Sequence, residues 1–302
     1  MTGAPQTPGP PRASPPVAGF GTGLLTTTVT GDDADGYRWH RCPGPLAPSP
    51  FHRTDPQLSE RLGEHVPDGR TLLVPGDGVG SSRVYRVGGH ESVAAVLLRD
   101  GPQPRLRSAL RDLGSALRVL HGLAAPAPKP GVGPRGLDRL DTWLAGRSPV
   151  ASAGRAGFLL RRILGETRWR ILQDWSTAVR TDHAAALAHG APGLGSLIVD
   201  ARSGSAQLLV GEDVCAAPWY FDLGWVVGEL VELTWYAGGD TRPWQDLTNE
   251  LFAGYGRDPG DRWNRMAVLR IALHLHDFTA YVGWNEQEFR RYAAFLTYLI
   301  DL

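Results

Sequence analysis

Several side chains able to handle protons or metal ions lie between residues 187 and 225. His189 follows one apolar stretch, Glu212 and Asp213 follow the next, and Asp222 lies at the start of a third. Carboxylate oxygens are ligands that Mg²⁺ prefers, so Glu212 and Asp213 are candidate metal ligands. Two adjacent acids are also typical of a solvated loop, and these two residues alone favour that interpretation.

The stretch 187–200, LAHGAPGLGSLIVD, resembles the catalytic segment of aminoglycoside phosphotransferases and related kinase-like enzymes. In that family a His-Gly-Asp opens a loop, and an Asn lies five residues after the Asp. Here His189 and Gly190 match, Ala191 stands at the position of the catalytic base, and Ser196 stands at the position of the Asn. Alanine neither accepts a proton nor holds a metal, and a serine hydroxyl is a weaker Mg²⁺ ligand than a carboxylate. The resemblance therefore implies the family's fold without its usual chemistry.

The family's metal-binding Asp comes after the next strand, ahead of an Asp-Leu pair that Asp222 and Leu223 match. Counting back from this pair places Val210 at the metal position. A shorter loop would instead bring Glu212 or Asp213 into the metal site, and the sequence leaves this open. The resemblance also implies that Asp222 braces the catalytic loop.

A cation for nucleotide phosphates is the next requirement, because kinases use a lysine on the third strand. The only lysine is Lys129, within the run APAPKPGVGPRG. Arg38 or Arg41 would replace it, although a guanidinium is not equivalent to an ammonium. Gly21 and Gly23 lie where a phosphate-covering loop belongs, with 76–82 as an alternative. The helix expected at 55–66 would supply Glu60 or Glu64 as the partner of the cation.

Composition narrows the function classes. The 302 residues are 42% hydrophobic, with 31 basic and 31 acidic residues and a net charge of zero, so partners such as nucleic acid or a membrane are not expected. Two cysteines without metal-ligand spacing predict reduced thiols and a cytoplasmic protein. Heavy use of Arg, Ala, Gly and Pro suggests a high-GC genome, such as that of an actinomycete.

The expected organisation is an α+β, bilobal, protein-kinase-like fold. A disordered Pro-rich tail at 1–16 precedes a small β-rich lobe at 17–101 and a helical lobe at 102–302. Strands are expected within 17–41 and at 70–75, 83–87 and 92–98, with a hinge at 99–102.

Helical spacing predicts helices at 106–123, 136–145, 156–189, 221–236, 263–281 and 286–301. The first carries Leu113-Gly114 and Leu120-His121, a further signature of the same family. The arginines of the third form either a solvated face or a docking surface for an acidic peptide or partner: Arg161, Arg162, Arg168 and Arg170. Within 263–281, His274, His276 and Asp277 are candidates for a substrate groove or for packing.

Two functions fit these residues. The first is a degenerate member of the family that binds a peptide or partner enzyme, resembling kinase homologues of lanthipeptide and thioamitide biosynthesis. Its partners would be a precursor peptide, a lyase or another modification enzyme. The second is an active, non-standard phosphotransferase that uses ATP and Mg²⁺ to phosphorylate Ser or Thr of the precursor. There Glu212 or Asp213 would hold Mg²⁺, and His189 or Asp222 would assist proton transfer. An antibiotic-resistance kinase is less well supported, because acidic groups that would bind an aminoglycoside are not evident.

Overall fold

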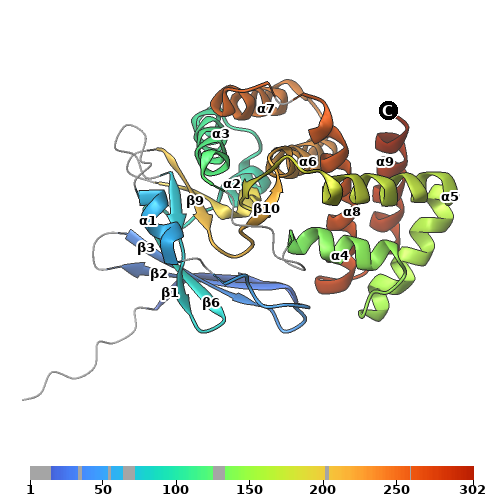
Figure 1. The fold of residues 1–302 in the computed structure, drawn as a ribbon, viewed down its shortest axis with the longest axis horizontal. Coiled ribbons are helices and arrows are strands. Elements are labelled where there is room, and N and C mark those ends of the chain that lie inside the picture. The colour runs from blue at the N-terminus through green and yellow to red at the C-terminus, as the bar shows by residue number, and fades with distance from the viewer. Residues whose placement is uncertain are drawn as a thin grey trace, which may run out of the picture.

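The computed structural model describes residues 15–32, 36–53, 56–63, 72–124, 133–200, 204–258 and 260–302. Residues 1–14 of the expected tail lie outside these ranges, as do Glu64 and Lys129. Figure 1 shows a β-rich part formed by the first third of the chain and a larger helical part formed by the rest.

The β-rich part contains a five-stranded antiparallel sheet in the order β1-β2-β3-β6-β5. Its strands are β1 (Pro16–Gly21), β2 (Leu25–Asp32), β3 (Gly36–Pro43), β5 (Asp77–Val79) and β6 (Ser82–Val87). Successive side chains of a strand point to opposite faces. Along β3, Trp39 and Arg41 are therefore buried, whereas Arg38 and His40 are exposed.

Two short elements connect this sheet with the rest of the chain. Helix α1 (Pro56–Gly63) falls within the helix expected at 55–66. Strand β4 (Leu73–Pro75) joins a second sheet, in the order β4-β9-β8, where it runs parallel to β9 (Ala206–Val210). β8 (Leu197–Val199) is the antiparallel neighbour of β9. The hairpin that follows the catalytic-like loop is thus attached to the first part of the chain.

A helix, α2 (Val93–Asp100), forms where a strand was expected at 92–98. Short apolar runs fit either period, and here the N-cap decides, because Ser92 Oγ accepts a hydrogen bond from the backbone N–H of Ala95 at 3.2 Å. The strand prediction was wrong. The change from strands to helices lies at residues 88–92, ahead of the expected hinge.

The helical part is built on two pairs of helices, α3 on α7 and α6 on α8. A Cβ on Gly114 of α3 would lie 2.1 Å from the carbonyl oxygen of Leu251 in α7, so the close approach of these helices requires glycine. The helices are α3 (Leu106–Gly122), α4 (Arg135–Leu144), α5 (Ala151–Thr181), α6 (Tyr220–Ala237), α7 (Arg242–Tyr255), α8 (Arg262–Tyr281) and α9 (Glu286–Asp301).

The helix expected at 156–189 ends earlier than predicted. α5 breaks at Gly165, which has φ 75°, and stops at Thr181. Strand β7 (Ala185–Ala188) then pairs antiparallel with β10 (Cys215–Pro218), which brings His189 next to the segment that carries Asp213. Among the described residues, no helix combines the length and apolar character needed to cross a membrane.

Candidate functional site

The loop after β7 keeps the frame of a catalytic loop. The buried carboxylate of Asp222, on α6, accepts hydrogen bonds from the backbone N–H groups of His189 at 2.7 Å and Gly190 at 3.0 Å. Its Oδ2 also lies 2.9 Å from Nε2 of His121, on α3. Asp222 therefore fixes the start of the loop, which is the bracing geometry that the resemblance implies.

His189 is held by both of its ring nitrogens. Nδ1 accepts from the N–H of Ala191 at 3.3 Å, so Nε2 carries the proton and donates to the carbonyl oxygen of Leu209 at 2.7 Å. The side chain is buried, with 4% of its surface exposed. This arrangement leaves neither nitrogen available to a substrate, and the proton-transfer role considered for His189 finds no support in the geometry.

Arg41 reaches from β3 into this loop. Its guanidinium donates to Ser196 Oγ at 2.9 Å, to the carbonyl oxygen of Gly195 at 2.8 Å and to Glu212 Oε1 at 3.1 Å. Tyr85, on β6, donates to the same Glu212 oxygen at 2.9 Å, and burial followed by the negative charge of Glu212 raises the pKa of Tyr85 well above its ordinary value. The strand cation is thus bonded to Ser196, in the loop after β7, and to Glu212, in the turn after β9.

Arg38, the other candidate cation, lies on the opposite face of the same strand. It pairs there with Asp32 at 2.9 Å and does not face the loop. Glu60 is exposed on α1. Arg41 is therefore the strand cation that reaches the loop, because it lies on the buried face of β3.

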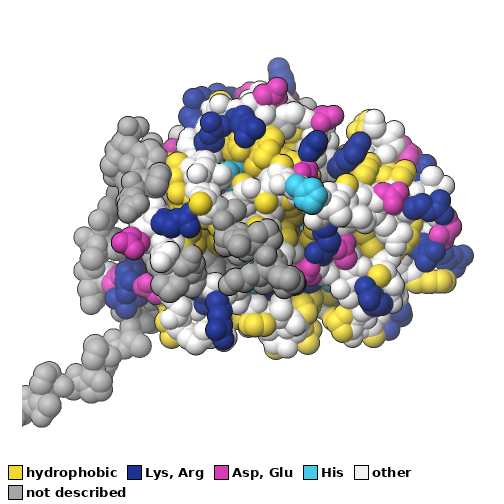
Figure 2. Space-filling view, viewed as in Figure 1, with side chains coloured by type: hydrophobic (Ala, Val, Ile, Leu, Met, Phe, Trp, Pro, Cys, Tyr) yellow, Lys and Arg dark blue, Asp and Glu magenta, His cyan; other side chains and the backbone are white. Residues whose placement is uncertain are grey.

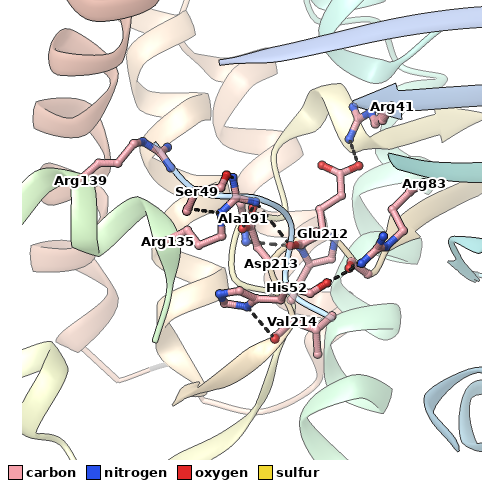
Figure 3. A network of polar contacts seen from close by, with 12 residues as sticks. Arg41, Ser49, His52, Arg83, Arg135, Arg139, Ala191, Glu212, Asp213 and Val214 are labelled. Carbon is pink, nitrogen blue, oxygen red and sulfur yellow. Dashed lines mark hydrogen bonds and ion pairs between the residues drawn. The ribbon is translucent and has the colours of Figure 1, made fainter. Parts of the chain in front are cut away.

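Asp213 is paired with a second arginine. Nη1 of Arg135, at the start of α4, lies 2.9 Å from Asp213 Oδ1, and the same guanidinium donates to Ser49 Oγ and to the Ser49 carbonyl oxygen, each at 3.2 Å. Figure 3 shows these groups gathered around Ala191. Val210 is buried in β9. Among the residues that the structure describes, no three His, Cys, Asp or Glu side chains are placed to share a metal ion.

Residues 44–53, which we call the cleft segment, run between the two parts of the molecule beside this site. The backbone N–H of His52 donates to the carbonyl oxygen of Glu212 at 2.9 Å. Nδ1 of the same residue lies 3.1 Å from the carbonyl oxygen of Val214. The ring of Phe51 lies between two guanidinium groups, with Arg83 Cζ at 5.8 Å and Arg135 Cζ at 5.4 Å from its centre. Sequence reasoning missed this segment because it is Pro-rich and carries no periodic pattern.

The expected phosphate loop is also tied down. The turn between β1 and β2 contacts the helical part, because the N–H of Gly23 donates to the carbonyl oxygen of Tyr281 at 2.8 Å. The N–H of Leu46, in the cleft segment, donates to the Gly23 carbonyl oxygen at 2.8 Å. Gly21 ends β1, and the alternative loop at 76–82 is part of the β5–β6 hairpin at the far edge of the sheet.

A hydrophobic cluster fills the space between the five-stranded sheet and the β8–β9 hairpin. Trp39, 1% exposed, lies within it, and its indole N–H donates to the carbonyl oxygen of Gly89 at 2.9 Å. The buried members are Val29, Trp39, Val74, Tyr85, Val87, Ile198 and Leu209. The inward face of the sheet is therefore packed directly against the second sheet.

A carboxylate missed by sequence reasoning also reaches the loop. Glu229, on α6, accepts from the backbone N–H of Leu194 at 2.9 Å, and its burial raises its pKa. Sequence reasoning could have found Glu229 only by working out which side chains of α6 face the loop.

The histidines and acid of α8 do not converge on one point. Asp277 accepts from Arg139 at 2.7 and 3.0 Å and lies 2.8 Å from His276 Nδ1, whereas His274 lies 3.3 Å from Glu232. His276 and Asp277 thus pair within the helical part, whereas His274 lines a pocket between α8 and α9 together with Phe278 and Tyr292.

The stability of the fold at acid pH should depend on Asp277. Burial favours its neutral form, yet Arg139 and His276 hold its pKa at about 2, below the ordinary 3.8. A pKa that is lower in the folded state contributes stability that is present above the unfolded value and lost as pH falls through the folded one. We expect the free energy of unfolding to fall by roughly 2 kcal/mol from this group between about pH 4 and pH 2.

Urea unfolding at stepped pH measures this loss. The variant Asp277→Asn should lack this part of the pH dependence, whereas Asp301→Asn, in an exposed pair with Arg168, should retain it. An unchanged acid profile in Asp277→Asn would contradict the assignment.

The arginines expected to form a docking surface lie on both sides of the break in α5. Arg161 pairs with Glu166 and Arg168 with Asp301, in both cases through two hydrogen bonds. Arg162 lies over the exposed ring of Phe158, with Cζ 6.0 Å from its centre. Half of the expected surface is therefore paired with acids of the same chain.

No protein-family model matches the chain, and no curated protein matches it in sequence. Solved structures do match. Amicoumacin kinase hAmiN, in complex with AMP-PNP, Ca²⁺ and Ami, superposes with a TM-score of 0.56 at 12% identity, covering 94% of this chain and 87% of the kinase.

Two further matches are of the same quality. Choline kinase LicA from Streptococcus pneumoniae gives a TM-score of 0.56 at 10% identity, covering 94% of each chain. A Plasmodium vivax ethanolamine kinase gives 0.55 at 10% identity, covering 92% of this chain and 80% of that one. The predicted bilobal, kinase-like fold is confirmed.

Proposed function

We propose that this kinase-fold chain does not transfer phosphate from ATP and instead acts as a binding component for a peptide or a partner protein. One observation carries the proposal: Arg41, the strand cation, is bonded to Ser196 and Glu212, which stand at or beside the metal-ligand positions of the family. A cation held in this way is not directed at phosphate. Ala191 removes the usual proton acceptor as well.

The packed cluster around Trp39 supports the same conclusion. In kinases a loop of the small lobe covers the phosphates while the metal ligands come from the large lobe, so the nucleotide lies between the lobes. Moving Trp39 aside would expose roughly 200 Å² of apolar surface, which costs roughly 5 kcal/mol. A ligand with a dissociation constant of 1 mM gains only about 4 kcal/mol. Opening this cluster would therefore cancel the binding free energy of a millimolar nucleotide and weaken a tighter one by several thousandfold.

The residues also do not fit Mg²⁺. Glu212 and Asp213 each face an arginine at 2.9–3.1 Å, and Val210 offers no oxygen from its side chain. A metal ion would have to displace Arg41 or Arg135, whose charges repel it.

The binding role that remains is the one expected from the resemblance. We propose a precursor peptide or its modification enzyme, within a peptide natural-product pathway, as the partner. The charge of α5 favours an acidic peptide as the partner, because the helix carries six arginines and only two acidic residues.

Calorimetric titration of the folded protein with ATP and GTP, each with and without Mg²⁺, tests the proposal. We expect no saturable heat from the wild type. The variant Trp39→Ala is the matched probe, because it empties the space between the sheets. If this variant binds nucleotide weakly and the wild type does not, the result would support the proposal that Trp39 fills the nucleotide site. Saturable, Mg²⁺-dependent binding by the wild type would overturn the proposal and favour the alternative, an active phosphotransferase acting on Ser or Thr of a precursor peptide.

A further inference from the structure

A cavity of about 330 Å³ opens at the corner between α4 and α5, away from the loop that carries Ala191. Its wall combines aromatic rings, glycines and one arginine, including Trp143, Gly154, Gly157, Phe158, Arg161 and Trp169. Gly154 leaves space open, since a Cβ there would meet no atom within 4 Å, whereas Gly157 packs closely against the indole of Trp143. Ligand-binding pockets of proteins are typically concave, of this size, and lined mainly by apolar side chains with a few polar groups.

One donor of this wall has no partner. The indole N–H of Trp169 is buried and makes no hydrogen bond with any described residue, and the whole side chain is 4% exposed. Its neighbour Trp143 does have one, because its indole N–H donates to the carbonyl oxygen of Ala153 at 2.7 Å. Buried donors are nearly always satisfied, and Trp169 lines the cavity, so a bound molecule with an acceptor oxygen is a candidate partner.

The rim supplies an apolar contact and positive charge. Phe158 is 68% exposed, with Arg162 over its ring. The ion pair of Arg161 with Glu166 is exposed on both sides, and exposed pairs are weak, so a ligand carboxylate can replace Glu166. Figure 2 shows basic side chains, with acidic ones among them, at the end of the molecule that α5 forms.

We infer that this cavity anchors an acidic peptide. An apolar side chain of the peptide enters between Phe158 and Gly154, its carboxylates meet Arg161 and Arg162, and an oxygen acceptor satisfies Trp169. The charge of α5 selects an acidic partner over a basic one, and the exposed aromatic wall selects a polypeptide over a bare polyanion. The inference rests on the proposed binding function and names the site and the chemistry of the partner.

Fluorescence anisotropy with a fluorescein-labelled peptide of alternating Glu and Leu tests the inference on the full chain. We expect saturable binding that weakens at least tenfold when Gln replaces Glu, or Ser replaces Leu, in the peptide. Gly154→Phe fills the cavity from a position with free space, so it should weaken binding at least tenfold while leaving the urea midpoint unchanged. Glu166→Gln should strengthen binding several-fold, because it releases Arg161.

Arg290→Gln is the control, since this arginine makes a similar exposed ion pair on α9, and it should leave binding unchanged. No binding by the wild type, or equal binding by Gly154→Phe, overturns the inference. Competition by a single-stranded oligonucleotide at equal affinity also overturns it, since it identifies a general polyanion surface. Nucleotide titration of the same sample tests the proposed function separately from the anchor site. Mg²⁺-dependent ATP binding by the wild type contradicts the proposed function. A wild type that binds neither ATP nor the peptide contradicts only the anchor site.

Discussion

Replacing Arg41 with alanine is expected to lower the free energy of unfolding by about 3–5 kcal/mol, because removing one partner of a buried pair leaves the other charge uncompensated. Arg41 is 4% exposed and bonds to Ser196, Gly195 and Glu212. The change also opens a gap between the sheet and the loop. Urea unfolding measured by tryptophan fluorescence gives the value.

Arg38→Ala is the matched control, since Arg38 lies on the exposed face of the same strand and 48% of its side chain is exposed to solvent. Its cost should stay within about 1 kcal/mol. In a double-mutant cycle with Glu212→Gln, we expect the combined loss to be smaller than the sum by about 1–3 kcal/mol. Additive losses would mean that Arg41 and Glu212 do not act as a pair.

Replacing Asp222 with alanine is expected to cost a similar amount, about 3–5 kcal/mol, through a different mechanism. The carboxylate is fully buried and holds the N–H groups of His189 and Gly190 together with the ring of His121. Its loss leaves these donors without acceptors inside the helical part. Gly190 has φ 86°, and a Cβ there would lie 2.1 Å from the Asp213 carbonyl oxygen. The backbone therefore packs closely against Asp213 at this position.

Unfolding in urea again measures this effect, and Asp240→Ala on the exposed turn before α7 is its control, which should leave the midpoint unchanged. Hydrogen exchange distinguishes the two large effects. Asp222→Ala should speed exchange in the loop at 189–196, whereas Arg41→Ala should also speed exchange in β3 and the cleft segment. A loss in Asp222→Ala no larger than in Asp240→Ala would contradict the bracing role.

Together these residues show how the kinase-like fold holds the loop that follows β7. Asp222 holds the loop in place, yet the position of the base is Ala191. The polar groups near it form two ion pairs, Arg41 with Glu212 and Arg135 with Asp213. The first pair joins the two parts of the molecule.

The sequence by itself determined the fold class, most of the helices and the identity of each side chain in the loop after β7. These follow from local information: the apolar periods of 106–123 and 286–301 gave helices α3 and α9, and the identity of Ala191 does not depend on the fold. The strand prediction at 92–98 failed because a short apolar run fits either period and the cap of Ser92 decided it.

Only the tertiary structure decided what the remaining polar residues do. The choice between Arg38 and Arg41 depends on which face of β3 is buried, and the pairing of Asp213 with Arg135 joins residues far apart in the chain. The position of the cleft segment, and the filling of the space between the sheets by Trp39, depend on how the two parts pack. Contacts of this kind leave no periodic signal in the sequence, because each is made between elements whose relative placement is fixed only when the whole core forms.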